Sequence, residues 1–387
     1  MSLKTSTMQS AKHAKQQKII KLLCEIETIN QVDIAKEIKT TLPTVISNVN
    51  ELVKEGILEI GGVGDSRGGR KPVIVNIRPN YKHIIGIDFL VDTVKINIFN
   101  FKMEVIAQEE IPTSRFINFD EIMDRLILII KDMLLSNNIT LSNLLGLGIS
   151  IPGIVNENSK NIEVAPNLHI ADKHLKKYNK LFGLPVYFEN EANAAAYAEW
   201  QAGAAKNSKN VLYFSIMKGV GAGIIINNKL YRGGRFKAGE VGHIIIRRNG
   251  RDCTCGEKGC LNEYISVESL YNEFFERSGR EVKTLSEFMA LKENNDPIAK
   301  KIWEEYIDDF AFGLKTIIST IDPDTIVIGG EIARYSDILI PSLNERLETS
   351  KSNVLNKKNK IISSELMENA SITGVALYIR NSFINSY

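Results

Sequence analysis

The sequence predicts two units in tandem: a small winged helix-turn-helix at the N-terminus and a larger α/β unit of two lobes. Three short helical patterns are followed by two strand patterns around a basic, glycine-rich segment. Beyond residue 79, strands and helices occur twice in a similar order. A chain of 387 residues is also too long for one ordinary core, so more than one domain is expected.

The bulk properties exclude several classes of protein. A net charge of +2 means that any nucleic-acid binding must come from a local basic patch. The longest apolar stretches, such as 126–130, are too short to cross a bilayer, and the first residues are too polar for a signal peptide. We therefore expect a cytoplasmic protein with no membrane partner, in which clustered cysteines indicate metal rather than disulfides.

The first unit begins with a polar, basic segment, residues 1–17, which is expected to be a flexible arm. Apolar residues then recur at helical spacing from Lys18 and predict a first helix. Asn30 is positioned to cap a second short helix. Thr41 is positioned to cap a third, in which Pro43 is tolerated in the first turn.

The wing follows the third helix, which is expected to end at Gly56. Strand patterns at 57–60 and 73–75 flank the glycine-rich segment 61–72. This segment carries three cations near its end: Arg67, Arg70 and Lys71. Residues 18–78 are therefore expected to form a winged helix-turn-helix domain.

Such a domain reads DNA through side chains that the third helix exposes to the major groove. The exposed early positions are expected to be Pro43, Thr44, Ser47 and Asn48. The wing cations suit phosphates or the minor groove. We expect operator DNA as partner and a homodimer or dimer of dimers, because these domains read two half-sites. The alternative is a helical domain for protein contacts, which the basic wing and the hydroxyl-rich helix face disfavour.

The second unit alternates strands and helices. The first set of strands is expected at 83–89, 94–99, 105–111, 144–151 and 185–189. The second set is expected at 211–216, 223–226, 243–246 and 325–328. Two α/β lobes follow, residues 79–200 with 374–387 and residues 201–373, and a ligand is expected between them.

A metal site is expected in the second lobe. Its candidate ligands are His243, Cys253, Cys255 and Cys260. Three thiolates and one imidazole in a short, glycine-rich loop match a closed tetrahedral zinc site, whereas buried hydrophobic cysteines suit such a polar loop poorly. Four protein ligands leave no open position, so we expect one structural zinc per chain.

These residues resemble the ROK family, which comprises repressors, uncharacterised open reading frames and sugar kinases. Residues 216–224, continued through Gly233, Gly239 and Gly242, resemble the family signature, and His243 with the three cysteines resembles its zinc motif. Further similar blocks lie at 148–153, 165–168 and 328–330. The resemblance covers nearly the whole chain and implies a hexokinase/actin-like fold for the two lobes. The fused winged helix resembles the repressor branch, where residues 189–194 are most similar to xylose repressors of Gram-positive bacteria.

The resemblance implies a sugar in the cleft, contacted by Asn190, Glu191, Glu240 and His243, with Asn167 as a weaker candidate. Carboxylates accept hydrogen bonds from paired hydroxyls, and an amide both donates and accepts. His243 would bind zinc through one ring nitrogen and meet the sugar with the other. The alternative is that these are surface or capping residues, since Glu191 opens a helix, where a carboxylate is favourable anyway.

Two departures from the family pattern matter. The family has a sugar-contacting glutamate two residues after the last zinc cysteine. Asn262 stands there, so either Asn262 or the neighbouring Glu263 is expected to contact the sugar. The family's kinases also have a Gly-Gly-Thr-Lys turn after the first strand, where this chain has bulky residues and Asp92. A negative charge beside phosphates is unfavourable, and bulky side chains keep the backbone away from them.

We therefore expect no catalytic residue and no enzymatic activity. The expected function is a sugar-responsive transcriptional repressor, released from its operator by xylose, with glucose as a second sugar that presents the same ring hydroxyls. The alternative is a ROK-type sugar kinase with a regulatory DNA-binding domain, because the kinases' catalytic aspartate is only lengthened to Glu191 here. A transcriptional activator or a scaffold is a third possibility that the sequence leaves open.

Overall fold

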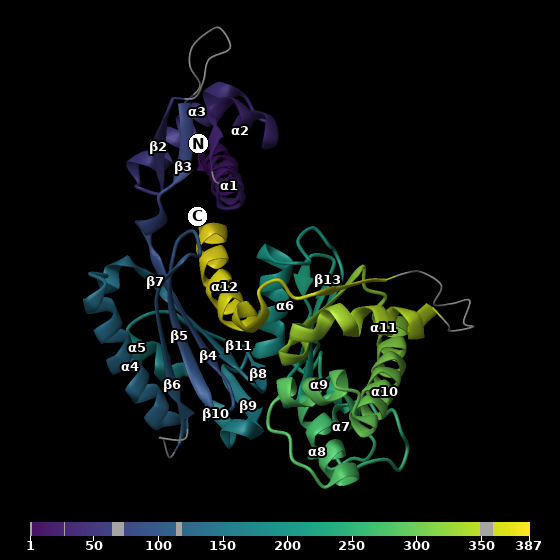
Figure 1. The fold of residues 1–387 in the computed structure, drawn as a ribbon. Coiled ribbons are helices and arrows are strands. Elements are labelled where there is room, and N and C mark those ends of the chain that lie inside the picture. Colours follow the sequence, from purple (N-terminus) through teal and green to yellow (C-terminus); the bar gives the residue numbers. More distant parts are fainter. Residues whose placement is uncertain (1, 27, 64–72, 114–117, 349–358) are drawn as a thin grey trace.

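The computed structural model describes the chain except for residues 1, 27, 64–72, 114–117 and 349–358; the side chains of 2–9, 63 and 167 also lie outside the described part. A small N-terminal domain stands at one end of a larger body (Figure 1). No helix in the described ranges is long and apolar enough to cross a membrane.

The N-terminal domain is a winged helix-turn-helix. Its helices are α1 (Ser2–Glu25), α2 (Gln31–Glu37) and α3 (Leu42–Lys54). Its antiparallel sheet has the order β1-β3-β2, with β1 (Ile29–Asn30), β2 (Leu58–Val63) and β3 (Val73–Ile77). The Asn30 side chain caps α2 as expected, accepting from the amides of Val32 and Asp33 at 3.0 Å each. Thr41 precedes α3 without a side-chain cap bond, and Gly56 follows the helix with φ +82°.

Two features of this domain differ from the expectation. α1 begins at Ser2, so the segment expected to be an arm continues the helix that was predicted from Lys18. Its polar half shows no apolar periodicity, yet it contacts α3. Lys12 forms a 2.7 Å ion pair with Glu51, and the Gln16 amide donates to the same carboxylate at 2.9 Å. Strand β1 was not expected, because two residues carry no pattern of their own.

The first lobe is built on a five-stranded sheet with the order β11-β7-β4-β5-β6. The strands are β4 (His83–Phe89), β5 (Thr93–Asn100), β6 (Val105–Pro112), β7 (Leu144–Ile151) and β11 (Val186–Asn190). Helices α4 (Phe119–Ser136) and α5 (Lys176–Phe182) cover one face. A small sheet extends the lobe, with β8 (Ile154–Asn156), β9 (Asn161–Ala165) and β10 (Ile170–His174).

The second lobe repeats this plan with the strand order β14-β13-β12-β15-β16. The strands are β12 (Val211–Ile216), β13 (Val220–Ile226), β14 (Lys229–Leu230), β15 (Thr325–Gly330) and β16 (Lys360–Ser363). Its helices are α7 (Asn262–Ile265), α8 (Val267–Ser278), α9 (Leu285–Glu293), α10 (Pro297–Ile321) and α11 (Ser336–Glu348). The strand expected at 243–246 is wrong: the chain makes a 3-10 turn at Val241–His243 and only a single bridge, Ile245 to Cys260.

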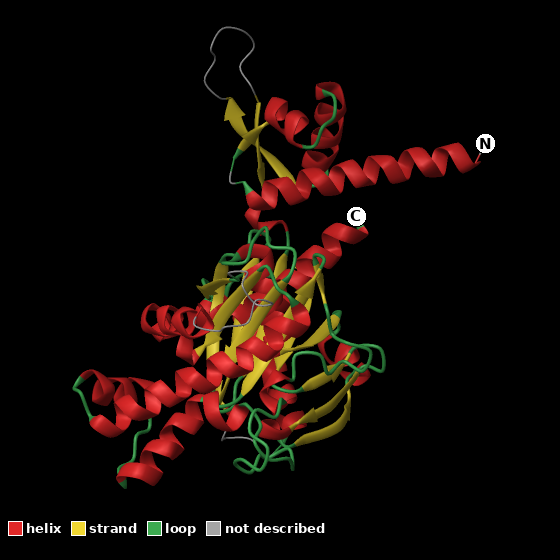
Figure 2. Cartoon of the chain, turned by 90° about the vertical axis from the view of Figure 1, so that its right-hand side faces the viewer, coloured by secondary structure: helices red, strands yellow, loops and turns green. Residues whose placement is uncertain are grey.

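Two helices lie between the sheets: α6 (Glu191–Ala202) and α12 (Ala370–Ser386). Small residues let them touch, since a Cβ on Gly374 of α12 would lie 1.8 Å from the Ala194 carbonyl oxygen of α6. The C-terminal end of α12 reaches the winged helix domain, where Ile384 joins the core around Ile19. Figure 2 shows this end just below α1, where the Gln17 amide donates to the Asn385 carbonyl at 2.8 Å. Helix α12 therefore connects the region between the two lobes with the N-terminal domain.

Candidate functional site

The exposed face of α3 is the part of the N-terminal domain that can reach bases. Pro43 and Ser47 are exposed and Thr44 is half-buried. Asn48 is only 4% exposed, and its amide donates to the Thr44 carbonyl at 2.7 Å. The expectation that Asn48 lies on the exposed face is therefore wrong. Helical spacing explains this, because position 48 falls on the same side as the buried Val45 three residues earlier.

Asn50 is the exposed asparagine of α3, three residues after Ser47 and on the same face. Its amide can make the paired contact to adenine that was expected of Asn48. Ile46, beside it, is 38% exposed, and an apolar side chain can contact a thymine methyl group. The wing cations Arg67, Arg70 and Lys71 fall outside the described residues.

The structure brings His243, Cys253, Cys255 and Cys260 together, with all ligand atoms within 4.8 Å of one another. Cys253 Sγ lies 3.7 Å from His243 Nδ1, and Cys255 Sγ lies 3.7 Å from Cys260 Sγ. The sulfur separation is much longer than a disulfide bond of about 2 Å. Ligands on a tetrahedron with metal–sulfur bonds of about 2.3 Å lie about 3.7 Å apart. The donor set and its spacing therefore fit one zinc ion.

The loop that carries the cysteines closes tightly on itself. The Cys253 amide donates to the Glu257 carbonyl at 2.9 Å. Gly259 has φ +78°, and a Cβ there would lie 1.7 Å from the Arg247 carbonyl oxygen. Only glycine fits such a position, so this residue lets the chain return Cys260 to the cluster.

His243 faces two different groups. Its Nδ1 points to Cys253, and its Nε2 lies 3.9 Å from Glu240 Oε2. Glu240 immediately precedes the 3-10 turn that ends at His243. The imidazole ring thus lies between the cysteine cluster and the Glu240 carboxyl group.

Asn190 and Glu191 lie where β11 runs into α6. Asn190 caps this helix by accepting from the Asn193 amide at 3.0 Å. Its own side-chain amide donates to the Gly153 carbonyl at 3.0 Å and to the Glu191 carboxyl group at 2.8 Å. Asn190 therefore does act as a cap, and this role holds its amide beside Glu191.

Two further carboxyl groups from separate segments lie near enough to Glu191 to act on its charge: Asp88, close to the end of β4, and Glu240. Burial raises the pKa of Glu191 to about 8, and the neighbouring Glu240 and Asp88 add to the rise. Burial also raises the pKa of Asp88 and of Glu240. With a pKa of about 8, Glu191 retains its proton at neutral pH and can donate as well as accept hydrogen bonds, which suits a hydroxyl-rich ligand. Asp88 was not expected at the site, because a single acid at a strand end is not distinctive.

Glycines of the signature segment allow this convergence. A Cβ at Gly223 of β13 would lie 2.3 Å from the Ala192 carbonyl oxygen in α6. Gly239 has φ +97°, and a Cβ there would lie 1.9 Å from the Ala222 carbonyl oxygen. The second lobe therefore packs directly on the first turn of α6, and its Glu240 comes close to Glu191 of the first lobe.

The three other residues expected to contact the sugar are Asn262, Glu263 and Asn167. Asn262 Oδ1 accepts from the Val220 amide at 2.9 Å and so supports the start of β13, while its amide donates to Glu263 at 3.0 Å. Burial, and a side-chain hydrogen bond with Glu263, raise the pKa of the Cys253 thiol, which places Glu263 against the cysteine cluster. Asn167 lies in the 3-10 turn Pro166–Leu168, but its side chain is outside the described part.

The turns that follow β4 and β12 approach each other across the two lobes. Asp92 accepts from Lys218 Nζ at 2.8 Å, and both side chains are exposed. The acidic residue that replaces the kinases' phosphate turn is thus paired with a lysine of the opposite lobe.

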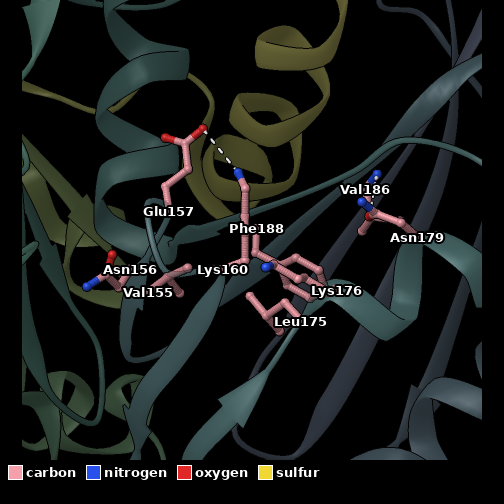
Figure 3. Close-up of a pocket in the computed structure, with 9 residues that line it drawn as sticks. All are labelled: Val155, Asn156, Glu157, Lys160, Leu175, Lys176, Asn179, Val186 and Phe188. Carbon is pink, nitrogen blue, oxygen red and sulfur yellow. Dashed lines mark hydrogen bonds and ion pairs between the residues drawn. The ribbon is translucent and has the colours of Figure 1, made fainter.

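A separate small cavity lies in the first lobe beneath β8 and α5 (Figure 3). Glu157 and Lys160 form a 3.8 Å ion pair beside it, and Phe188 contributes to its wall. Its volume of about 30 Å³ is that of a water site and is too small for a sugar.

Comparison with known proteins gives consistent matches. A sequence model of the ROK family matches residues 84–382, and one described as winged helix-turn-helix DNA-binding matches residues 13–59. The xylose repressor of Bacillus spizizenii is 30% identical over 376 residues, which is 97% of each chain. A glucokinase of Halalkalibacterium halodurans is 27% identical over 281 residues, 68% of this chain and 84% of the kinase.

Among solved structures, a ROK family transcriptional regulator, a homologue of the E. coli MLC protein, has the same fold. It superposes with a TM-score of 0.81 at 23% identity and covers 97% of this chain and 98% of its own. The family match spans both lobes and the second match covers the N-terminal helices. The chain therefore belongs to the ROK family and carries a winged helix-turn-helix domain ahead of the ROK domain.

Proposed function

We propose that this protein is a transcriptional repressor of xylose-utilisation genes that leaves its operator when xylose binds between the lobes. The observation that carries this proposal is the convergence of Asn190, Glu191, Glu240 and His243, which belong to both lobes, beside a helix pair that reaches the DNA-binding domain. The names of full-length relatives as xylose repressors support the choice of sugar. In this proposal the repressor acts in the cytoplasm, where its operator DNA lies.

A zinc ion held by His243, Cys253, Cys255 and Cys260 has a structural role in this proposal. Bound there, the metal supplies a closed tetrahedral link between the cysteine loop and the turn that carries Glu240. With Nδ1 on the metal side, the proton of the imidazole is on Nε2, which can donate to a sugar hydroxyl. Glu240 then accepts from the next hydroxyl, because Nε2 and Oε2 lie 3.9 Å apart.

On the opposite side, Glu191 and the Asn190 amide meet the sugar. Asn190 Nδ2 already donates both of its protons, to Gly153 and to Glu191, so the side chain is held before a ligand binds and would accept from a sugar hydroxyl through Oδ1. Asn262 supports the site through β13, and Glu263 and Asn167 stay as weaker candidates. Xylose lacks only the hydroxymethyl group of glucose, so glucose is expected to compete for the same groups.

The sugar acts on DNA binding through α6 and α12. Xylose must bind the DNA-released arrangement better than the DNA-bound one, because equal affinity would shift nothing. A change in the angle between the lobes moves α6, and α12 packs against α6 and reaches the core of the winged helix domain. In a homodimer, or a dimer of dimers, this changes the spacing of the two recognition helices.

The DNA contacts are assigned to Pro43, Thr44, Ser47 and Asn50 of α3 and to the wing. Arg67, Arg70 and Lys71 contact phosphates in this proposal, so neutralising one should weaken all DNA binding alike and reduce the salt slope by about 1.

The alternative, a ROK sugar kinase, is disfavoured by the Asp92–Lys218 pair. Phosphates would have to approach the Asp92 carboxylate and compete with it for Lys218. Incubation with ATP and xylose or glucose should therefore give no sugar phosphate. Sugar-dependent ATP consumption on the order of 1 per second or faster would favour the kinase.

The main test is titration of xylose, glucose and N-acetylglucosamine against an operator complex. Xylose should release the DNA, and Glu240→Ala should abolish release while DNA binding is kept. Glu276→Ala removes an exposed carboxylate on α8 and is the matched control. This variant should still release the operator when xylose is added. Release by N-acetylglucosamine alone, or by none of the three, would defeat the assignment.

A further inference from the structure

A second, larger cavity lies where α1 of the winged helix domain meets the ROK domain. Its volume of about 700 Å³ is well within the range of small-molecule sites. Segments from five parts of the chain line it: α1, the turn after β5, the end of α6, the β13–β14 turn with the residues after it, and α12. None of the residues expected to hold the sugar or the zinc belongs to this wall.

The wall of this cavity is strongly cationic. Its charged side chains are Lys21, Lys102, Lys206, Lys229, Arg232, Arg380 and Glu25. Lys206 lies 3.9 Å from Glu25, and Arg232 pairs with Glu189. The other four cations have no carboxylate partner among the residues that the structure describes. Since the whole chain carries only +2, this local excess is not a general property of the surface.

Two of these cations, Arg380 and Lys102, lie near the same residue of α1, Cys24. Burial raises the pKa of the Cys24 thiol on α1; the charges of Arg380 and Lys102 oppose this rise and Glu25 adds to it, so the cations of α12 and of the β5–β6 turn both lie near α1. Among the described residues, the guanidinium of Arg380 makes two hydrogen bonds of 3.3 Å, both to the neutral Asn381 amide oxygen. A guanidinium in this situation has donors left for a planar or tetrahedral anion.

The rest of the wall suits a ring with hydroxyl groups. Tyr197, Trp200 and Tyr378 contribute half-buried aromatic rings. One face of Tyr378 is stacked on Tyr187, and Tyr197 packs edge to face on Trp200 and Tyr378, so the ring surface that stays exposed is the part that can pack on a sugar or base ring. Asn381 Nδ2 already donates to Gln201 Oε1 and to the Tyr197 hydroxyl at 2.9 Å each, so within the described residues Gln201 Nε2 and the Asn228 side chain are the amide groups left to bond a ligand.

We propose that this interdomain cavity is a binding site for a small phosphorylated ligand, a phosphate ester of a sugar-sized ring, held by Lys102, Lys229 and Arg380 of the ROK domain and by Lys21 of α1. Such a ligand would bridge the two domains, because its phosphate meets cations from both. The proposal does not rest on the assignment of xylose or of the operator.

The test uses the full-length protein and isothermal titration with ribose 5-phosphate, ribose and inorganic phosphate. Ribose 5-phosphate should bind with one site per chain, and ribose and inorganic phosphate should each bind at least about tenfold more weakly, because each offers only part of the contacts. Arg380→Gln and Lys102→Gln should each weaken ribose 5-phosphate binding by about tenfold or more. Lys131→Gln makes the same charge change at an exposed lysine on α4 and should leave the affinity for ribose 5-phosphate unaltered.

A second measurement locates the ligand. Hydrogen exchange should show protection by ribose 5-phosphate in both 18–25 and 377–385. Glu240→Ala should retain the binding, since Glu240 lies at the sugar site and not in this wall. The proposal is overturned by no binding up to about 10 mM, by equal weakening in Lys131→Gln, by protection of only one segment, or by loss of binding in Glu240→Ala. Tighter binding of an acidic hexapeptide than of ribose 5-phosphate would point to a protein partner and would also overturn it.

Discussion

Arg232 and Glu189 form a largely buried ion pair that joins the two lobes beside Asn190. Arg232 Nη2 lies 2.6 Å from Glu189 Oε2, and the two side chains are 19% and 4% exposed. The Tyr187 hydroxyl donates to the same carboxylate oxygen and accepts from Arg232 at 2.7 Å. The other oxygen, Oε1, accepts from the main-chain N–H of Asn190 at 3.1 Å. This pair therefore holds the strand end that positions Asn190.

Replacing one member of this pair should destabilise the ROK domain. Arg232→Gln leaves the Glu189 carboxylate buried without its cation, which costs about 3 kcal/mol and should lower the thermal midpoint by about 6 °C. Adding Glu189→Gln removes that charge and should recover part of the loss. Lys218→Gln breaks the exposed pair with Asp92 and should shift the midpoint by no more than about 2 °C. Equal shifts in Arg232→Gln and Lys218→Gln would contradict a special role for the buried pair.

Metal analysis of protein prepared without added metal should find about one zinc per chain. Cys255→Ser should lower that content and the thermal midpoint, because it removes one of four ligands. Cys24→Ser is the matched control, since Cys24 lies on α1, and it should keep the full metal content. Full zinc content and unchanged stability in Cys255→Ser would rule out this ligand set.

The two asparagines of α3 should behave differently in DNA binding. Asn50→Ala should weaken binding to a selected operator by about tenfold, the loss expected for one paired base contact. Asn48→Ala should stay within about threefold, because a side chain that is 4% exposed has no path to a base edge. Quantitative gel-shift titration measures the operator affinity of both variants, and circular dichroism checks that they are folded. A larger loss in Asn48→Ala would mean that the buried position controls recognition.

The carboxyl cluster should make stability depend on pH. The pKa of Glu191 is raised from an ordinary value near 4.5 to about 8, so the folded protein holds a proton that the unfolded chain releases. The contribution is fully present below pH 4.5 and falls as the pH rises towards 8. The loss between pH 4.5 and 7 is about 3 kcal/mol. Glu191→Gln, which stays neutral, should flatten this part of the profile in urea denaturation, whereas Glu276→Gln should leave it unchanged.

The local features of this protein were determined by the sequence alone. Asn30 caps α2, Gly56 ends α3, and the three cysteines lie within eight residues of one another, so neighbouring positions in the chain are enough to predict them. The repeated α/β pattern and the family resemblance predicted two lobes, and the structure has two five-stranded sheets. Regular spacing carries this information because helices and strands have fixed periods.

Tertiary structure decided which of these residues meet. The burial of Asn48 is not an example, because helical spacing from the buried Val45 already places it on the face of α3 that packs against the domain core. Glu189 and Arg232 are 43 residues apart in the chain, and Asp88 is still further from Glu240, so no local pattern links them. Their contact depends on how β13 packs against α6 and on how α12 is inserted between the sheets. The burial that raises the pKa of Glu191 and pairs Arg232 with Glu189 exists only after the lobes have assembled, because desolvation is a property of the packed core.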